Sequence, residues 1–150
     1  MVKHSIFHAI SFQIICIFEG VFNQIVTNNL YLCRRIAKEL ITDAIKRHLI
    51  PEEVSPMQSS IIYAEEADVL NVAMFGMTAK QWRDANPNLN GNIRDYATIN
   101  ELICLSNMEN INAVLIDEGV PQGERLVKLN QIAIHQMQVL EGNEGRKLLK

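Results

Sequence analysis

The chain has 150 residues, of which 48% are hydrophobic and 21% charged, with only four prolines. A chain of this size can bury about two-thirds of its unfolded surface, so it needs neither a metal nor a disulfide in order to fold. The net charge of −3 excludes a surface that is basic throughout, as in many proteins that coat nucleic acid, but it leaves room for a local basic patch.

The first 32 residues differ in composition from the rest of the chain. They carry one acid, Glu19, and one base, Lys3, whereas charges are dense and evenly spread from residue 33 onward. This shift predicts two regions, an apolar N-terminal segment (1–32) and a helical domain (33–150). We expect the first to form an apolar helix or strand packed on the rest, or a segment foreign to the ancestral domain.

The apolar stretch from Ile6 to Phe18 resembles the core of a signal peptide, because Lys3 precedes it. However, His8 and Gln13 interrupt it and no A-x-A-like cleavage site follows. It is also too short and too polar to span a bilayer. We therefore expect neither secretion nor membrane insertion.

Helical patterns begin at residue 33. Pro51 ends a first amphipathic helix, and Gly76, a usual residue for a helix C-terminus, ends a second. The apolar face of the first helix contains Ile36, Leu40, Ile41, Ala44, Ile45 and Leu49, and that of the second contains Ile62, Val69, Leu70, Ala73 and Met74.

Two capping boxes predict the next two helices. Thr78, three residues before a glutamine, opens a short helix that carries Trp82 and ends at the Asn86-Pro87 pair. Thr98, three residues before a glutamate, opens a long helix from Ile99 to Glu118, with a glycine beyond its end.

Apolar residues surround that long helix on nearly every side, which is typical of a buried helix. Pro121 suits the first turn of a last helix, which we expect to end before Gly142. The short link between these two helices predicts an antiparallel hairpin. The expected fold is therefore all-α, a small helical bundle with a buried central helix and a C-terminal antiparallel helical hairpin.

The residue types that catalysis requires are scarce. His4 and His8 have the spacing of a metal pair only if their segment is helical, and the acids Glu65, Glu66 and Asp68 are more simply a solvated face than a magnesium site. No phosphate-binding glycine loop or nucleophile motif is present. We expect no catalytic residue, no metal, no cofactor and no small-molecule substrate.

Three cysteines, Cys16, Cys33 and Cys104, form no close-spaced pair. An odd, dispersed set suits a reducing cytoplasm better than a disulfide framework, so we expect a cytoplasmic protein with structural thiols.

Residues 69–86 have the outline of a helix-turn-helix, in which a glycine turn joins two helices. Lys80, Gln81 and Arg83 would face a DNA groove, since glutamine and arginine make bidentate contacts to base edges. The same sequence pattern is also expected for any two packed helices that are joined by a glycine turn. In that interpretation Trp82 is a buried core residue. The neighbouring Asp84 also disfavours DNA.

Several motifs follow one another between residues 33 and 150. They are Thr42-Asp43-Ala44-Ile45-Lys46, Leu49-Ile50-Pro51, Tyr63-Ala64-Glu65-Glu66-Ala67-Asp68, the run from Asn71 to Arg83, the run from Gly91 to Thr98, and Glu124-Arg125-Leu126. With these motifs, roughly residues 33–150 resemble the region that follows the KilA-N domain in KilA-N domain-containing proteins of phages and mobile elements.

The resemblance implies a DNA-associated or antirepressor-like role without a reaction or a cofactor. Nothing in residues 1–32 resembles the KilA-N domain itself, which suggests a truncated protein or a separately encoded accessory piece. The leading hypothesis is a non-enzymatic accessory module for protein interaction or oligomerisation. The alternative is direct DNA binding through Lys80, Gln81 and Arg83, joined by Arg94.

Overall fold

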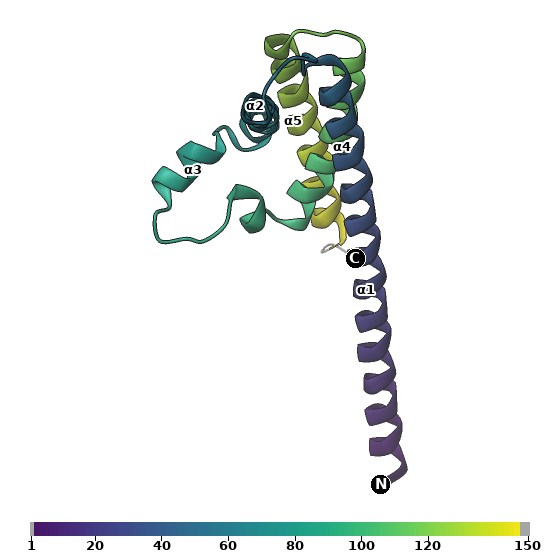
Figure 1. The fold of residues 1–150 in the computed structure, drawn as a ribbon. Helices are drawn as coiled ribbons and strands as arrows, with labels where there is room; N and C mark the ends of the chain where they lie inside the picture. Colours follow the sequence, from purple (N-terminus) through teal and green to yellow (C-terminus); the bar gives the residue numbers. More distant parts are fainter. Residues whose placement is uncertain (1, 148–150) are drawn as a thin grey trace. The chain divides into compact units, whose positions relative to one another are not determined.

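The computed structural model describes the backbone of residues 2–147 and the side chains of residues 20, 24 and 27–142. Over this backbone all regular secondary structure is helical, which confirms the expected all-α class (Figure 1). The elements are α1 (Val2–His48), α2 (Pro56–Phe75), α3 (Ala79–Ala85), the 3₁₀ helix η1 (Ile93–Tyr96), α4 (Ile99–Asp117) and α5 (Gln122–Lys147).

The chain divides into two compact units, residues 1–35 and 36–150. The first unit consists of the N-terminal part of α1, which is helical from Val2 onward. The helix expected to begin near residue 33 is therefore the end of a longer helix. No helix in the described part of the chain is both long and apolar enough to cross a membrane.

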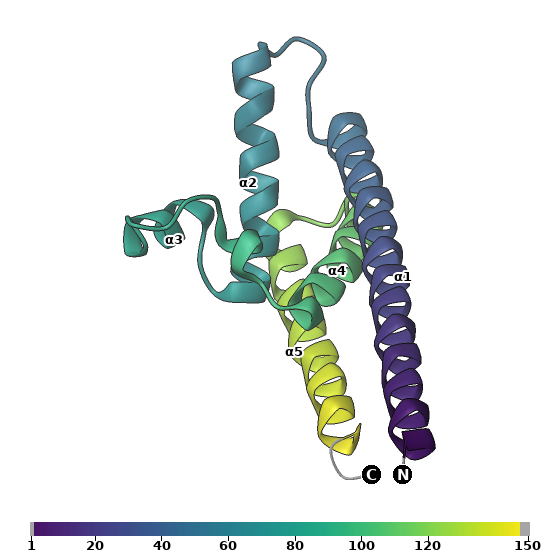
Figure 2. The same cartoon turned by 90° about the horizontal axis from the view of Figure 1, so that it is seen from below.

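The second unit is organised around α4. Figure 1 shows α4 between α5 and the last turns of α1, with α2 seen end on, and Figure 2 shows α2 along its length. Eight residues of α4 are buried, including Leu105, Met108 and Ile116. α5 packs against both α2 and α4. The buried central helix and the C-terminal hairpin are therefore confirmed.

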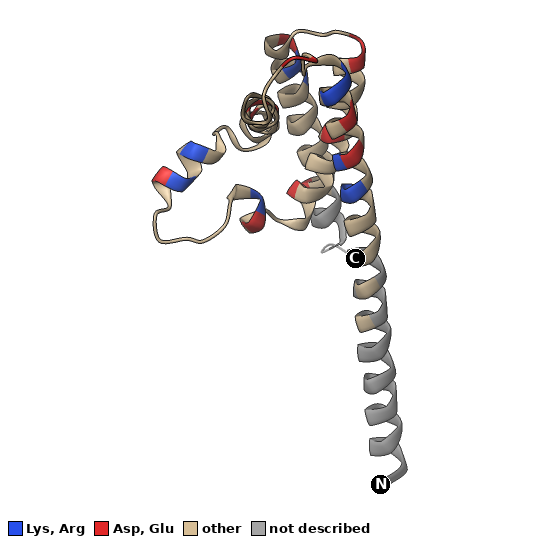
Figure 3. Cartoon of the chain, in the orientation of Figure 1, with Lys and Arg blue, Asp and Glu red and all other residues tan. Residues whose placement is uncertain are grey.

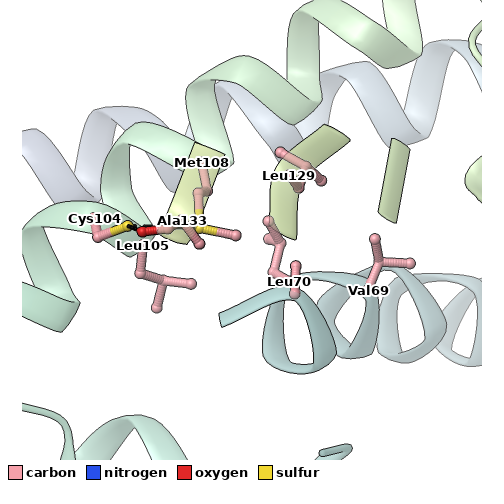
Figure 4. Packing of buried hydrophobic residues seen from close by; sticks show 8 residues of the cluster. Val69, Leu70, Cys104, Leu105, Met108, Leu129 and Ala133 are labelled. Carbon is pink, nitrogen blue, oxygen red and sulfur yellow. Dashed lines mark hydrogen bonds between the residues drawn. The ribbon is translucent and has the colours of Figure 1, made fainter. Parts of the chain in front are cut away.

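Two apolar clusters hold these helices together. In the first, Leu70 of α2, Met108 of α4 and Leu129 of α5 meet, and the buried thiol of Cys104 lies 4.0 Å from the carbonyl oxygen of Ala133 (Figure 4). The second joins the last turns of α1 to α4 through Ile41, Ala44, Ile45, Ala113 and Ile116. Burial of aliphatic side chains on this scale is the main stabilising contribution in a small domain.

The local signals at the helix ends account for most boundaries. The capping boxes at Thr78 and Thr98 are present as expected, and Ser55 and Asn92 form two more, which were not predicted from the sequence. Gly76 ends α2 in the left-handed conformation, with φ 74°, and Gly119 does the same after α4. A residue with a side chain is strained there, which is why glycine is favoured.

The end of the last helix was also predicted wrongly. α5 continues through Gly142 to Lys147. A glycine inside a helix costs only about 1 kcal/mol relative to alanine, so it does not by itself end a helix.

The apolar face predicted for the end of α1 is only partly buried. Ile41, Ala44 and Ile45 lie in the core, but Ile36 and Leu40 are about half exposed. On α4, Ile99 and Val114 also point to solvent. Unit 2 therefore leaves aliphatic side chains uncovered on two neighbouring helices.

Candidate functional site

Polar contacts position α3 at the end of α2. After the left-handed Gly76, the Thr78 hydroxyl accepts a hydrogen bond from Gln81 N. A carboxylate oxygen of Asp68 accepts from Ala79 N at 2.7 Å, at the start of the helix. A negative charge at a helix N-terminus is stabilising. Residues 69–86 thus have the helix, turn, helix outline that the sequence indicated.

The side chains predicted to read DNA on α3 are largely engaged within the protein. Lys80 Nζ lies 2.7 Å from the carboxylate of Asp84, and Gln81 Oε1 accepts from Thr78 N at 2.8 Å. Arg83 is exposed. Figure 3 shows basic and acidic residues side by side on this helix. α3 has seven residues, about 10 Å of helix, which is a short element for a DNA groove.

Trp82 anchors α3 to η1. The indole is buried, and its ring centroid lies 5.2 Å from that of Tyr96. Pairing of two aromatic rings at this distance is favourable. The segment 79–97, containing α3, the following loop and η1, is therefore a small lobe with its own aromatic contact. Neither apolar cluster of the bundle includes a residue of this lobe.

Arg94, the fourth residue predicted to bind DNA, has its guanidinium in the interior, with the side chain only 22% exposed. It donates to Asn71 Oδ1 at 3.0 Å, to Glu109 Oε1 at 3.0 Å and to the carbonyl oxygen of Ala67 at 3.2 Å. One side chain thus ties the lobe to α2 and α4. Arg94 is not brought together with Arg83 into one basic surface.

A second buried ion pair joins α2 to α5. Arg125 is 1% exposed and donates to both carboxylate oxygens of Glu66, at 2.6 and 2.8 Å. The same guanidinium donates to Asn112 Oδ1 on α4 and to the carbonyl oxygen of Val120. A bidentate pair of this kind fixes orientation as well as distance. This ion pair was not predicted from the sequence, because Glu66 stands among neighbouring acids that were expected to form a solvent-exposed helix face.

The environment of Glu66 lowers its pKa. Burial alone would raise the pKa, but the hydrogen bonds and charge of Arg125 oppose it, with smaller contributions from Gln122 and Asn112. The Asn112 amide contributes by proximity, since its Nδ2 has no hydrogen-bond partner of regular geometry in the described part of the chain. The pair is therefore ionised at neutral pH.

The acids considered for a metal site have separate structural contacts. Glu66 pairs with Arg125, Asp68 caps α3 and accepts from Asn71, and Glu65 is exposed. No group of three potential metal ligands occurs among the residues with described side chains. Burial raises the pKa of Cys104, which opposes reactivity of that thiol. His4 and His8 lie outside the residues with described side chains.

An open groove of about 350 Å³ runs between α4 and α5. Ile111, Leu115 and Ile132 supply its apolar surface. Its remaining lining residues are Lys128, Gln131, His135 and Gln136. An apolar floor with polar edges is the composition of a docking surface rather than of a catalytic pocket.

The groove and the exposed aliphatic side chains of the three helices α1, α4 and α5 are here called, together, the outer face. On α4, Ile99, Ile103 and Val114 recur at helical spacing on the side opposite the helix's contacts with α2. The outer face is defined by these three residues, Ile36 and Leu40 of α1, Ile111 and Leu115 of α4, and Ile132 and Val139 of α5.

Searches against known protein families, curated proteins and solved structures find no match to this chain.

Proposed function

We propose that this protein is a non-enzymatic interaction module, and that it binds another protein through the outer face. We further propose, from the resemblance of residues 33–150 to the region that follows KilA-N domains, that the module accompanies DNA-associated proteins of phages or mobile elements. The module then acts as an accessory to DNA binding, in the cytoplasm.

The observation that carries this proposal is the exposure of aliphatic side chains across three adjacent helices. Val114 is 55% exposed, and Ile36, Leu40, Ile99 and Val139 are similarly uncovered. A single exposed aliphatic residue is ordinary, but several of them on neighbouring helices beside an apolar groove favour an interaction site. The groove near Val114 is a concave site that a side chain of the partner can fill.

The buried polar groups also support a structural role for the interior. The ion pairs of Glu66 and of Arg94 connect helices through hydrogen bonds at close to ideal length. Networks of this type rigidify a scaffold. A rigid scaffold favours recognition through a preformed surface, because less conformational entropy is lost on binding.

A photo-crosslinking amino acid placed at Val114 tests the proposal. The matched control position is Val127, which is 57% exposed on another side of α5. We expect a protein adduct from position 114 and none from position 127. Mass spectrometry of the adduct identifies the partner. If neither position gives an adduct in cells that express the protein, the outer face is not an interaction surface.

Direct DNA binding is the second candidate, favoured by the capped α3 and its exposed Arg83. In this alternative Lys80 leaves Asp84 to contact phosphate. A fluorescence anisotropy titration with duplex DNA at low and moderate salt tests it. Binding should weaken with salt, and Lys80→Ala and Arg83→Ala should each lower the salt dependence. Absence of salt-sensitive binding by the unaltered protein would count against this candidate.

A further inference from the structure

We infer that the acceptor oxygens around Arg94 form a binding site for an arginine side chain. Arg94 occupies this site while the lobe lies against the bundle, and an arginine of a partner protein can occupy it when the lobe moves away. The acceptors are Asn71 Oδ1 and the carbonyl oxygen of Ala67 on α2, and the carboxylate of Glu109 on α4. The site shares no residue with the outer face, so the inference does not depend on the proposed interaction function.

The acceptors belong to the bundle and not to the lobe. Asn71 is 4% exposed and Glu109 is 5% exposed. Their chain neighbours Leu70 and Met108 are members of the first apolar cluster, which holds α2 and α4 together. Acceptors on a fixed scaffold lose little conformational entropy when a ligand binds. The site is therefore formed by the bundle itself.

The arrangement of the acceptors selects a planar cation with several donors. Nε of Arg94 donates to Asn71, and Nη1 donates to Glu109, both at 3.0 Å. Nη2 donates to the carbonyl oxygen of Ala67 at 3.2 Å. The acceptors thus face three different nitrogens around one plane. They do not converge on a single point, as ligands do around a metal ion or the ammonium of a lysine. The site is complementary to a guanidinium.

The lobe that carries Arg94 is set apart from the core of the bundle. Figures 1 and 2 both show α3 away from α4 and α5. The chain enters the lobe after the left-handed Gly76 and leaves it through the extended residues Ala97 and Thr98. A few residues of this kind at the ends of elements can absorb the change in backbone angles of a hinge. Movement of the lobe then leaves the acceptors of α2 and α4 in place.

The buried carboxylate of Glu109 determines which ligand can replace Arg94. When the lobe moves away, this carboxylate loses the charge of Arg94, and a buried charge without a counter-charge is strongly unfavourable. Exchange of one guanidinium for another keeps the carboxylate paired and its neighbouring acceptors satisfied. Arg94 is therefore an internal ligand, which blocks the site against arginine side chains of other proteins until the lobe opens.

The variant Arg94→Ala of the full chain tests the site with ethylguanidinium, which matches the end of the missing side chain. Ethylguanidinium should raise the Tm of this variant, because a ligand that binds the folded chain stabilises it. The emission of Trp82 should return toward that of the unaltered chain. Ethylammonium at the same ionic strength should bind at least about tenfold more weakly, since it lacks the planar set of donors. Circular dichroism follows unfolding.

Three further proteins serve as controls. Arg94→Ala combined with Glu109→Gln should bind ethylguanidinium at least about tenfold more weakly than Arg94→Ala, because the carboxylate is lost. Arg47→Ala removes an arginine from an ion pair with Asp117, whose side chain is 42% exposed, and should gain no response, since a hydrated carboxylate binds cations weakly. The unaltered chain should not respond beyond the general effect of the salt, because Arg94 occupies the site.

N-acetylarginine amide tests whether an arginine from another chain can reach the site. It should bind Arg94→Ala and not the unaltered chain. If ethylguanidinium binds this variant and N-acetylarginine amide does not, the site serves the lobe alone and the inferred partner is wrong.

Three results would overturn the site itself. They are a folded Arg94→Ala that does not respond to ethylguanidinium, an equal response to ethylammonium, and an equal response of the unaltered chain. If Arg94→Ala is not helical by itself, ethylguanidinium should restore its helicity, and a chain that stays unfolded with this ligand would also contradict the inference.

Discussion

Two arginines connect the helices of unit 2 from within. Arg125 joins α2, α4 and the start of α5, and Arg94 joins the lobe to α2 and α4. Neither role was visible in the sequence, where an arginine near a helix terminus is most often a surface residue. A guanidinium can make such contacts because its donors diverge in one plane, which a lysine cannot reproduce.

Removal of Arg125 alone should be strongly destabilising. In Arg125→Met the carboxylate of Glu66 stays buried without its counter-charge, and we expect a loss of about 3–5 kcal/mol in the free energy of unfolding. The double variant Glu66→Leu with Arg125→Met should recover most of this loss, because no buried charge remains. Urea unfolding followed by circular dichroism measures both. Equal destabilisation of the single and double variants would contradict this account.

The lowered pKa of Glu66 predicts how stability depends on pH. The unfolded chain has the ordinary glutamate pKa of about 4.3, and the folded chain has a lower one. The stabilising contribution is therefore fully present above pH 4.3 and is lost as the pH falls through the lower, folded value. Thermal unfolding between pH 7 and 2.5 should show a steeper loss for the unaltered chain than for Glu66→Gln. Parallel curves would show that Glu66 does not contribute.

Arg94→Ala should loosen the lobe while leaving the bundle folded. Trp82 is the only tryptophan in the chain, so its emission reports on the lobe alone. We expect a shift to longer wavelength in Arg94→Ala, with helicity nearly unchanged. Arg83→Ala is the matched control, since Arg83 is exposed, and its emission should equal that of the unaltered chain. Equal spectra for all three proteins would show that Arg94 does not hold the lobe.

At the level of whole helices, the sequence predicted most of unit 2 correctly. Capping boxes at Thr78 and Thr98 and glycines at 76 and 119 act through neighbouring residues only, so a reading of the sequence can recognise them. The box at Ser55 has a glutamine three residues later and was equally visible. The end of α5 could not be predicted in this way, because Gly142 weakens a helix without ending it.

Replacement of Gly142 should therefore stabilise the protein. An added Cβ at this position meets no atom within 4 Å, and the backbone is helical. We expect Gly142→Ala to raise the free energy of unfolding by about 0.5–1 kcal/mol. Gly76→Ala is the contrasting variant and should be destabilising, because φ at this residue is 74°. Chemical denaturation measures both, and a destabilising Gly142→Ala would show that α5 ends earlier.

At the scale of the whole molecule, the sequence predicted the fold class but not the outer face. Apolar residues nearly all around α4 indicated burial, and eight of its residues are indeed buried. Which side stays open depends on the directions from which α1, α2 and α5 approach, and a periodic pattern does not contain that information. The same limit applies to Arg94, whose ion partner Glu109 lies on another helix.

The way in which Arg94 and Asp68 hold the lobe has a thermodynamic consequence. The contacts of the two side chains are polar, but the lobe also buries Trp82 and Ile93. Detachment of the lobe exposes less apolar surface than unfolding of the whole bundle, so its heat-capacity change and its dependence on denaturant are both smaller. Amide hydrogens of α3 should therefore exchange at a rate that depends less on urea than that of α4, whose amides exchange only through unfolding of the bundle.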